Sequence, residues 1–251
     1  LLAVASYGVG TDIRDLPAVI HLNDMGFDYG VDLVEMANTI SFLMELWEKG
    51  IVTCADLAEW LGEEGSLEWG NWETAAKIIA AVGDQSCRLG QLFRDNVYRA
   101  AQRIEELKGV PVLQYVNYGM GGSVFTEDQR PFPMWAANMA VSARGADHLK
   151  GLVPVEKNAR KDISLAWFGR PEAAEIHGVA LKGAASARAE HVNCAINSTG
   201  ICIFMPTRDT LVFDLAALAP GLTALTGVPF TDADLYAIGE RTYNLEKAFN
   251  S

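Results

Sequence analysis

The stretch "VDLVEMANTISFLMELWEKGI", residues 31–51, decides the fold class of this chain. Its apolar side chains recur every three or four positions, which is the spacing that places them on one face of a helix. They are Leu33, Met36, Ala37, Ile40, Leu43, Met44 and Trp47. Lys49-Gly50 then supplies a helix stop. The stretch therefore predicts a long amphipathic helix with a wide apolar face.

Helical patterns continue on both sides of this stretch. Asp15, Thr53, Asn71 and Thr231 are suitable N-caps at the start of such segments. The predicted helices span residues 15–26, 53–62, 71–84, 90–109, 134–145, 171–197, 213–227 and 231–250. The segment 171–197 is one helix or two, since Gly178 or Gly183 could interrupt it. Short strands are conceivable only over residues 110–116 and 201–204.

The segment between residues 109 and 133 interrupts the helical pattern. It is rich in Gly, Pro and aromatic residues, which is typical of a linker. The sequence therefore predicts an all-α protein in two helical domains, over residues 1–115 and 116–251.

Composition limits the classes of function. Half of the 251 residues are hydrophobic, so the chain can bury a sizeable core. The net charge of −12 argues against nucleic acid as a partner. No apolar run of about 18 residues and no secretion signal is visible, so we expect no membrane span. The four cysteines and four histidines form no CxxC or HExxH motif, and a reducing, cytoplasmic setting is expected.

Four stretches, in order along the chain, resemble the tungsten-containing aldehyde:ferredoxin oxidoreductases. They are "NDMGFDYGVDLVEMANTISFLMELWEKGI" (23–51), "SARGADHLKG" (142–151), "NSTGIC" (197–202) and "IGERTYNLEKAFN" (238–250). The resemblance implies a bis-pterin that holds tungsten or molybdenum beside a [4Fe-4S] cluster. It also implies that the chain corresponds to the two helical domains of the family, and that the β-rich N-terminal domain and its cysteine run are not part of it.

The same resemblance assigns roles to residues of the polar loop and the first long helix. Cys202 would be the fourth cluster ligand, since thiolates suit iron–sulfur clusters. Gly200 would let the backbone approach the cofactor closely. Asn197, where the family has Asp, and Asp32 would contact the pterin through hydrogen bonds. From the residues alone, Cys202 could equally be a buried thiol and Asp32 a helix cap.

Two further roles come from the motif at residues 142–151. His148 would assist proton movement, because an imidazole titrates near neutrality. Lys150 would place a positive charge near the anionic cofactor. Without the resemblance, both residues read as a helix end that answers the helix dipole. Arg144 could anchor a helix end or bind a cofactor phosphate.

The function implied by the resemblance is oxidation of an aldehyde to a carboxylic acid. Electrons would pass through the cluster to ferredoxin or to a dedicated iron–sulfur subunit. Two alternatives stay open: a paralogue acting on another carbonyl substrate, such as a hydroxyacid or an aromatic acyl-CoA, and a cofactor-free helical scaffold. A homodimer is an open option for the assembly.

Overall fold

The computed structural model describes residues 2–119, 122–125, 128–145, 147–152, 155–204 and 215–250. The chain divides into two compact units, unit 1 over Leu1–Glu127 and unit 2 over Asp128–Ser251. This division falls later than the boundary after residue 115 that the sequence suggested, because the following segment packs on unit 1. There, Ser123 N–H donates to Glu35 Oε2 (3.2 Å) and Asn38 Nδ2 donates to Val124 O (3.0 Å).

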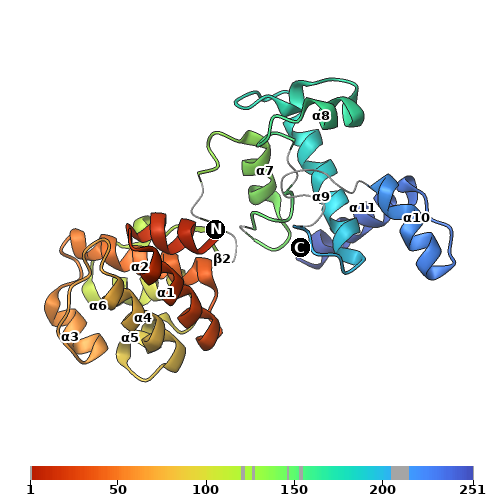
Figure 1. The fold of residues 1–251 in the computed structure, drawn as a ribbon. Coiled ribbons are helices and arrows are strands. Elements are labelled where there is room, and N and C mark those ends of the chain that lie inside the picture. Colours follow the sequence, from red (N-terminus) through yellow and green to blue (C-terminus); the bar gives the residue numbers. More distant parts are fainter. Residues whose placement is uncertain are drawn as a thin grey trace. The chain divides into compact units, whose positions relative to one another are not determined.

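Unit 1 is built from helices and one short antiparallel hairpin (Figure 1). Its elements are the π-helical turn η1 (Val4–Val9), α1 (Leu16–Tyr29), α2 (Leu33–Glu48), α3 (Cys54–Leu61), α4 (Trp72–Asp84), α5 (Arg88–Phe93), α6 (Val97–Lys108), the 3-10 turn η2 (Leu113–Tyr115), β1 (Tyr118–Gly119) and β2 (Gly122–Ser123). The hairpin pairs Tyr118 with Ser123 and Gly119 with Gly122.

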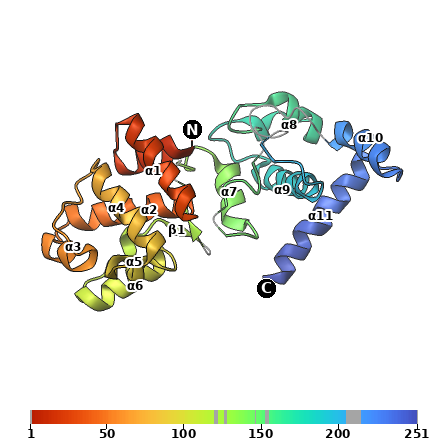
Figure 2. The same cartoon turned by 60° about the horizontal axis from the view of Figure 1, so that its bottom comes forward.

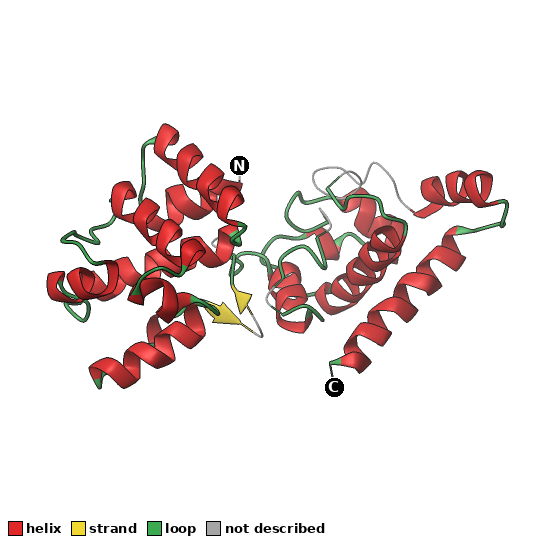
Figure 3. Cartoon of the chain, turned by 90° about the horizontal axis from the view of Figure 1, so that it is seen from below, coloured by secondary structure: helices red, strands yellow, loops and turns green. Residues whose placement is uncertain are grey.

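The described residues of unit 2 form helices joined by turns and loops (Figure 2). Its elements are α7 (Pro133–Val141), α8 (Lys161–Phe168), the 3-10 turn η3 (Glu172–Ala174), α9 (Lys182–Ser198), α10 (Leu215–Thr226) and α11 (Asp232–Phe249). Helix α9 packs along α11 and against α7, so it forms the centre of this unit. The predicted all-α class is confirmed, and the pair β1–β2 contains the only strands among the described residues (Figure 3).

Side-chain caps fix where several helices begin, as the sequence predicted. The side chain of Asn71 accepts a hydrogen bond from Thr74 N–H (3.0 Å) at the start of α4. Thr53 opens α3 in a capping box with Asp56, and Thr231 opens α11 in the same way. Each cap satisfies backbone N–H groups that have no partner inside the helix.

The predicted end of the first helix at Gly26 is wrong. Helix α1 runs on to Tyr29 and ends at Gly30, whose φ of 66° is left-handed. Gly26 is buried inside the helix, and a Cβ atom there would lie 3.4 Å from Tyr7 Oη. Gly26 therefore occupies a buried helical position beside Tyr7 and does not end the helix.

The single helix predicted over residues 90–109 is also wrong. The structure has α5 and α6 in its place, because Asn96 adopts an extended backbone and its side chain caps Arg99 N–H (2.9 Å). The conceivable strands over residues 110–116 and 201–204 are absent from the described chain. Gly183 lies within α9, so the helix begins after Gly178 and is not interrupted at Gly183.

Other differences concern unit 2. Helix α7 ends at Val141, before the predicted end at residues 144–145. Helix α8 was not predicted from the sequence. The first two residues of the predicted helix 213–227 lie outside the described residues.

The two units have separate hydrophobic cores. Unit 1 has one large core, to which α2 contributes the face predicted from its sequence, including Met36, Ile40 and Leu43. Unit 2 has two smaller clusters, one around Met134 and Ala185 and the other around the C-terminal half of α9. Among the described residues, none of the helices is both long enough and apolar enough to cross a membrane.

Candidate functional site

Asp32 lies in unit 1 at the N-terminus of α2. Its Oδ1 accepts a hydrogen bond from Glu35 N–H (2.8 Å), so the predicted capping role is confirmed. The side chain is exposed, and its other carboxylate oxygen has no hydrogen-bond partner among the described residues. Burial first, and the nearby Asp32 charge second, raise the pKa of Tyr7 well above its usual range. Asp32 therefore caps its helix and keeps one acceptor oxygen exposed.

The residues after Asp32 connect α2 to neighbouring elements of unit 1. Glu35 Oε1 accepts from Val97 N–H (2.6 Å) at the start of α6, and its Oε2 accepts from the β2 backbone. Met36 and Ala37 are buried in the core of unit 1. The segment thus ties α2 to α6 and the hairpin.

His148 lies in unit 2 in a turn that follows α7. Its backbone carbonyl accepts a hydrogen bond from Trp135 Nε1 (2.9 Å), and the two rings meet edge to face with centroids 6.4 Å apart. The amide of Asn193, fully buried on α9, donates to the carbonyls of Leu149 (3.2 Å) and Lys150 (3.0 Å). Trp135 and Asn193 therefore hold the half-buried imidazole in a fixed turn.

Lys150 turns inward from the same segment. Its side chain is only 3% exposed, and its ammonium forms an ion pair with Glu246 of α11. A buried ammonium needs such a partner, because desolvation of an unpaired charge costs several kcal/mol. To contact the anionic cofactor directly, as predicted, the Lys150 ammonium would have to leave its ion pair with Glu246.

A group of buried polar side chains surrounds Lys150. Burial is the main cause that raises the pKa of Glu190 and of the Cys194 thiol, and the Lys150 charge opposes both shifts. Burial and then a hydrogen bond with Glu190 raise the pKa of Tyr243 well above its usual range. Tyr243 Oη also donates to Val141 O (3.1 Å). These contacts join α9 and α11 to the end of α7.

Cys202 lies on the loop that follows α9. Gly200 adopts a φ of 78°, which turns the chain out of the helix. Ile201 and Ile203 pack against the core of unit 2, whereas the intervening Cys202 is exposed. Asn197 is also exposed, on the last turn of α9. The alternation displays the thiol on the surface, so Cys202 is not the buried thiol of the alternative interpretation.

The donor set around Cys202 fits only part of an iron–sulfur site. No group of three or more His, Cys, Asp or Glu side chains that could hold a metal ion occurs in the part of the chain that the structure describes. One exposed thiolate can complete a cluster whose other ligands come from elsewhere.

The sequence of this chain is similar to known oxidoreductases over its whole length. The family model described as aldehyde ferredoxin oxidoreductase, domains 2 and 3, matches residues 2–251.

The chain belongs to the aldehyde ferredoxin oxidoreductase family.

Among the relatives of this family member, the tungsten-containing aldehyde ferredoxin oxidoreductase of Pyrococcus furiosus is 27% identical over 99% of this chain. The protein of the same name from Pyrococcus horikoshii is 26% identical over 97% of this chain. In both cases the chain spans 37% of the relative's length. The aliphatic sulfonate oxidoreductase, WOR-like subunit, of Pyrococcus furiosus is 29% identical over 57% of this chain.

A solved structure shares the fold of this family member. The active-site complex BamBC of benzoyl coenzyme A reductase, bound to 1,5-dienoyl-CoA, matches 99% of this chain with a TM-score of 0.78. The matched part is 40% of that chain, and the sequence identity is 15%. At this identity the likeness concerns the fold.

Arg144 and the other histidine and cysteine side chains of this family member lie in different surroundings. Arg144 pairs with Asp147 three residues on, an arrangement that anchors a turn. His191 Nδ1 lies 3.0 Å from Tyr236 Oη on α11. Cys54 is exposed and Cys87 is half-buried at the start of α5.

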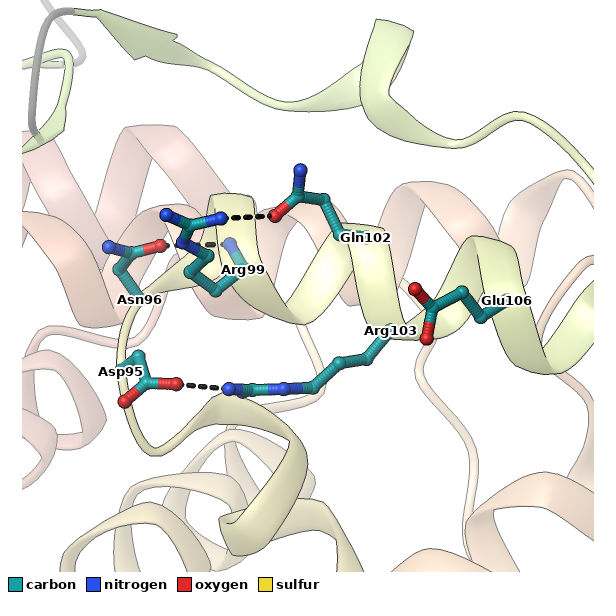
Figure 4. Close-up of a pocket in the computed structure, with 6 residues that line it drawn as sticks. All are labelled: Asp95, Asn96, Arg99, Gln102, Arg103 and Glu106. Atoms are coloured by element: carbon teal, nitrogen blue, oxygen red, sulfur yellow. Dashed lines mark hydrogen bonds and ion pairs between the residues drawn. The ribbon is translucent and has the colours of Figure 1, made fainter.

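A polar hollow on unit 1 contains none of the residues predicted from the sequence. Figure 4 shows it along α6 and the preceding loop, where it is lined by Asp95, Asn96, Arg99, Gln102, Arg103 and Glu106. Arg103 pairs with Asp95, and Arg99 Nη1 donates to Gln102 Oε1 (2.9 Å). Because its arginines are already engaged, we assign no function to this hollow.

Sequence reasoning missed Asn193, Glu190, Tyr243 and Glu246. A signal existed for the last two, since both belong to the stretch "IGERTYNLEKAFN" that carries the resemblance. The structure gives this motif a physical role. A Cβ atom on Gly239 would lie 1.9 Å from His191 O, so the glycine permits the close crossing of α9 and α11.

Proposed function

We propose that this chain is the helical part of an oxidoreductase that converts an aldehyde to a carboxylic acid. An aldehyde and water then give a carboxylate, three protons and two electrons, and the electrons pass through a [4Fe-4S] cluster to ferredoxin or a dedicated iron–sulfur subunit. When bound, a tungsten or molybdenum bis-pterin supplies the redox chemistry. The chain itself supplies positioning and proton handling.

The observation that carries this proposal is the exposed thiol of Cys202 in a family member. Ile201 and Ile203 pack against the core while the thiol between them is exposed, and Gly200 shapes the turn before it. A thiolate that binds iron has to be accessible, and the exposure of Cys202 supports this role.

Other residues of the chain have supporting roles in the proposal. The exposed oxygen of Asp32 would accept a hydrogen bond from a pterin N–H group. The exposed amide of Asn197 would donate a hydrogen bond to the pterin or accept one from it. His148, oriented through Trp135, would accept the proton released during oxidation. Lys150 would add positive charge to the same region from its ion pair with Glu246.

A second candidate function keeps the family and changes the substrate. It is supported by the relative named aliphatic sulfonate oxidoreductase and by the fold shared with benzoyl coenzyme A reductase. Reduction of a redox dye by the intact natural protein, measured with a panel of aldehydes, hydroxyacids and thioesters, separates the two. Activity on a thioester with none on any aldehyde would favour the second function.

Metal content tests the proposal directly. In the intact natural protein, Cys202→Ser should lower the iron content measured by elemental mass spectrometry, because one of four cluster thiolates is lost. The matched control is Cys54→Ser, which alters another exposed cysteine and should leave iron unchanged. Equal iron in both variants would contradict the role of Cys202. Intact natural protein that contains no iron, tungsten or molybdenum and reduces no dye with any substrate would instead support the scaffold hypothesis.

A further inference from the structure

Unit 2 contains a cavity of about 570 Å³ between α8, α9, α10 and α11. This volume is within the range of roughly 300–1,000 Å³ that is usual for small-molecule sites. Apolar side chains from all four helices line it, among them Trp167, Val192 and Leu215. None of the residues that we assign to the redox reaction lines this cavity.

Arg188 of α9 lies in the wall of the cavity between two aromatic rings. Its guanidinium carbon is 5.2 Å from the centre of the Trp167 ring and 4.9 Å from the centre of the Tyr236 ring. Its Nε is buried and has no hydrogen-bond partner among the described residues. No acidic side chain forms an ion pair with it among the residues that the structure describes. Cation–π contacts thus hold a guanidinium that has no ion-pair partner, and whose Nε donor is unused, within the described part of the chain.

Four other arginines of unit 2 differ from Arg188 in this respect. Each has an acidic partner two or three residues away: Arg130 with Asp128, Arg144 with Asp147, Arg160 with Asp162 and Arg170 with Glu172. Two acidic groups do line the cavity. The Asp162 carboxylate forms an ion pair with Arg160 (2.6 Å). Asp232 lies in the first turn of α11, where the helix dipole stabilises its negative charge.

We propose that this cavity binds a small carboxylate that carries an apolar or aromatic body, with Arg188 as its anchor. The planar guanidinium presents paired N–H donors that match the two oxygens of a carboxylate. The rings on either side fix the plane of this fork before a ligand arrives, which lowers the entropy lost on binding. The apolar walls then bury the body of the ligand. This inference does not depend on the proposed redox function.

Titration calorimetry with benzoate tests the proposal on the purified protein. Benzoate should bind in one saturable site, whereas benzyl alcohol, which has a similar shape and no charge, should bind at least about tenfold more weakly because it cannot form the charge-assisted pair. Arg188→Gln should weaken benzoate binding by a similar factor. The matched control, Arg170→Gln, removes an exposed arginine outside the cavity and should leave binding unchanged.

A second variant keeps the test valid if Arg188→Gln does not fold. Ala216 lines the cavity and is exposed, so Ala216→Phe would fill part of it without changing any charge. Loss of benzoate binding in this variant, with an unchanged circular dichroism spectrum, supports the site. Unchanged affinity in both variants, or no saturable binding by the wild-type protein, would overturn the proposal. Since the readout is binding, the result is independent of metal content and of redox activity.

Discussion

The two units bury different kinds of side chain. The described residues of unit 1 bury no charged group, and its buried polar residues are Ser6, Thr11, Asn38, Thr39 and Thr74. Unit 2 buries four charged side chains, Lys150, Glu156, Lys182 and Glu190, together with several neutral polar ones. Unit 1 is therefore stabilised mainly by apolar packing, whereas unit 2 depends in addition on specific polar contacts.

The unit that buries charged side chains, unit 2, is also the unit that carries most of the candidate site residues. Five of the six predicted site residues belong to unit 2, and buried polar groups hold the turn that carries two of them. Apolar packing alone tolerates exchange of one hydrophobic side chain for another of similar volume. A buried hydrogen-bonded network instead favours one arrangement, because a shifted network leaves more polar groups unpaired. The polar interior of unit 2 thus suits a unit that must position chemical groups.

The largest effect is expected from the buried ion pair of unit 2. Lys182 Nζ lies 2.7 Å from Glu156 Oε1, and both side chains are at most 5% exposed. Lys182→Met should lower the free energy of unfolding by about 3–5 kcal/mol, because it leaves a buried carboxylate without its charge partner. Denaturant-dependent hydrogen exchange, resolved by unit, measures this change.

The same substitution in unit 1 is the control. Lys77 pairs with Glu63 at 2.8 Å, but both side chains are about half exposed. Lys77→Met should change the free energy of unfolding by less than about 1 kcal/mol, since water screens the pair. Equal losses for Lys182→Met and Lys77→Met would mean that the two units do not differ as described.

An intermediate effect of similar size in both units is expected from two glycines at close helix contacts. A Cβ atom on Gly239 would lie 1.9 Å from His191 O, and one on Gly90 would lie 2.0 Å from Ala81 O. Gly239→Ala and Gly90→Ala should each lower the free energy of unfolding by about 1–3 kcal/mol, because the helices must separate.

Thermal unfolding followed by circular dichroism tests this pair of variants. The control is Gly183→Ala in α9, where an added Cβ atom meets nothing within 4 Å. This change should leave stability unchanged or raise it by up to about 1 kcal/mol. A large loss in only one of the two crossing variants would show that helix spacing, as well as buried charge, distinguishes the units.

The smallest effect concerns Glu190, which is 2% exposed and has one oxygen without a hydrogen-bond partner. Burial raises its pKa above the ordinary value of 4.5. As the pH rises from 4.5 towards the folded-state pKa, the unfolded chain ionises first, so this group lowers stability progressively. Glu190→Gln should therefore gain stability relative to wild type as the pH rises. Urea unfolding at pH 4 and pH 7 measures the gain, and a difference that is the same at both pH values would contradict it.

Local patterns were sufficient to predict much of the fold from the sequence. The apolar face of α2 and the caps Asn71 and Thr231 were read correctly, because each depends on residues within one or two turns. The continuation of α1 through Gly26 and the end of a helix before Asn96 were not predicted. Gly26 is buried beside Tyr7, a contact between segments that the local pattern does not show, and Asn96 adopts an extended backbone within a stretch of helical composition.

Less of the candidate site than of the fold could be predicted from the sequence. The positions of Asp32 and Cys202 came from motifs, and their exposure is now known. The inward pairing of Lys150 with Glu246 could not be predicted, because it joins residues far apart in the chain. The same applies to Asn193, whose amide reaches carbonyls more than forty positions earlier.

Because isoleucines flank Cys202 on both sides, the exposure of its thiol depends more on the number of residues in this part of the loop than on the identity of most of them. Ile201 and Ile203 fit the core of unit 2 as a pair, and the residue between them faces the opposite way. Inserting or removing one residue beside Cys202 would rotate the sulfur inward while leaving the composition nearly intact. The spacing between Ile201, Cys202 and Ile203 is thus a stronger constraint on this loop than the identity of the other residues around the thiol.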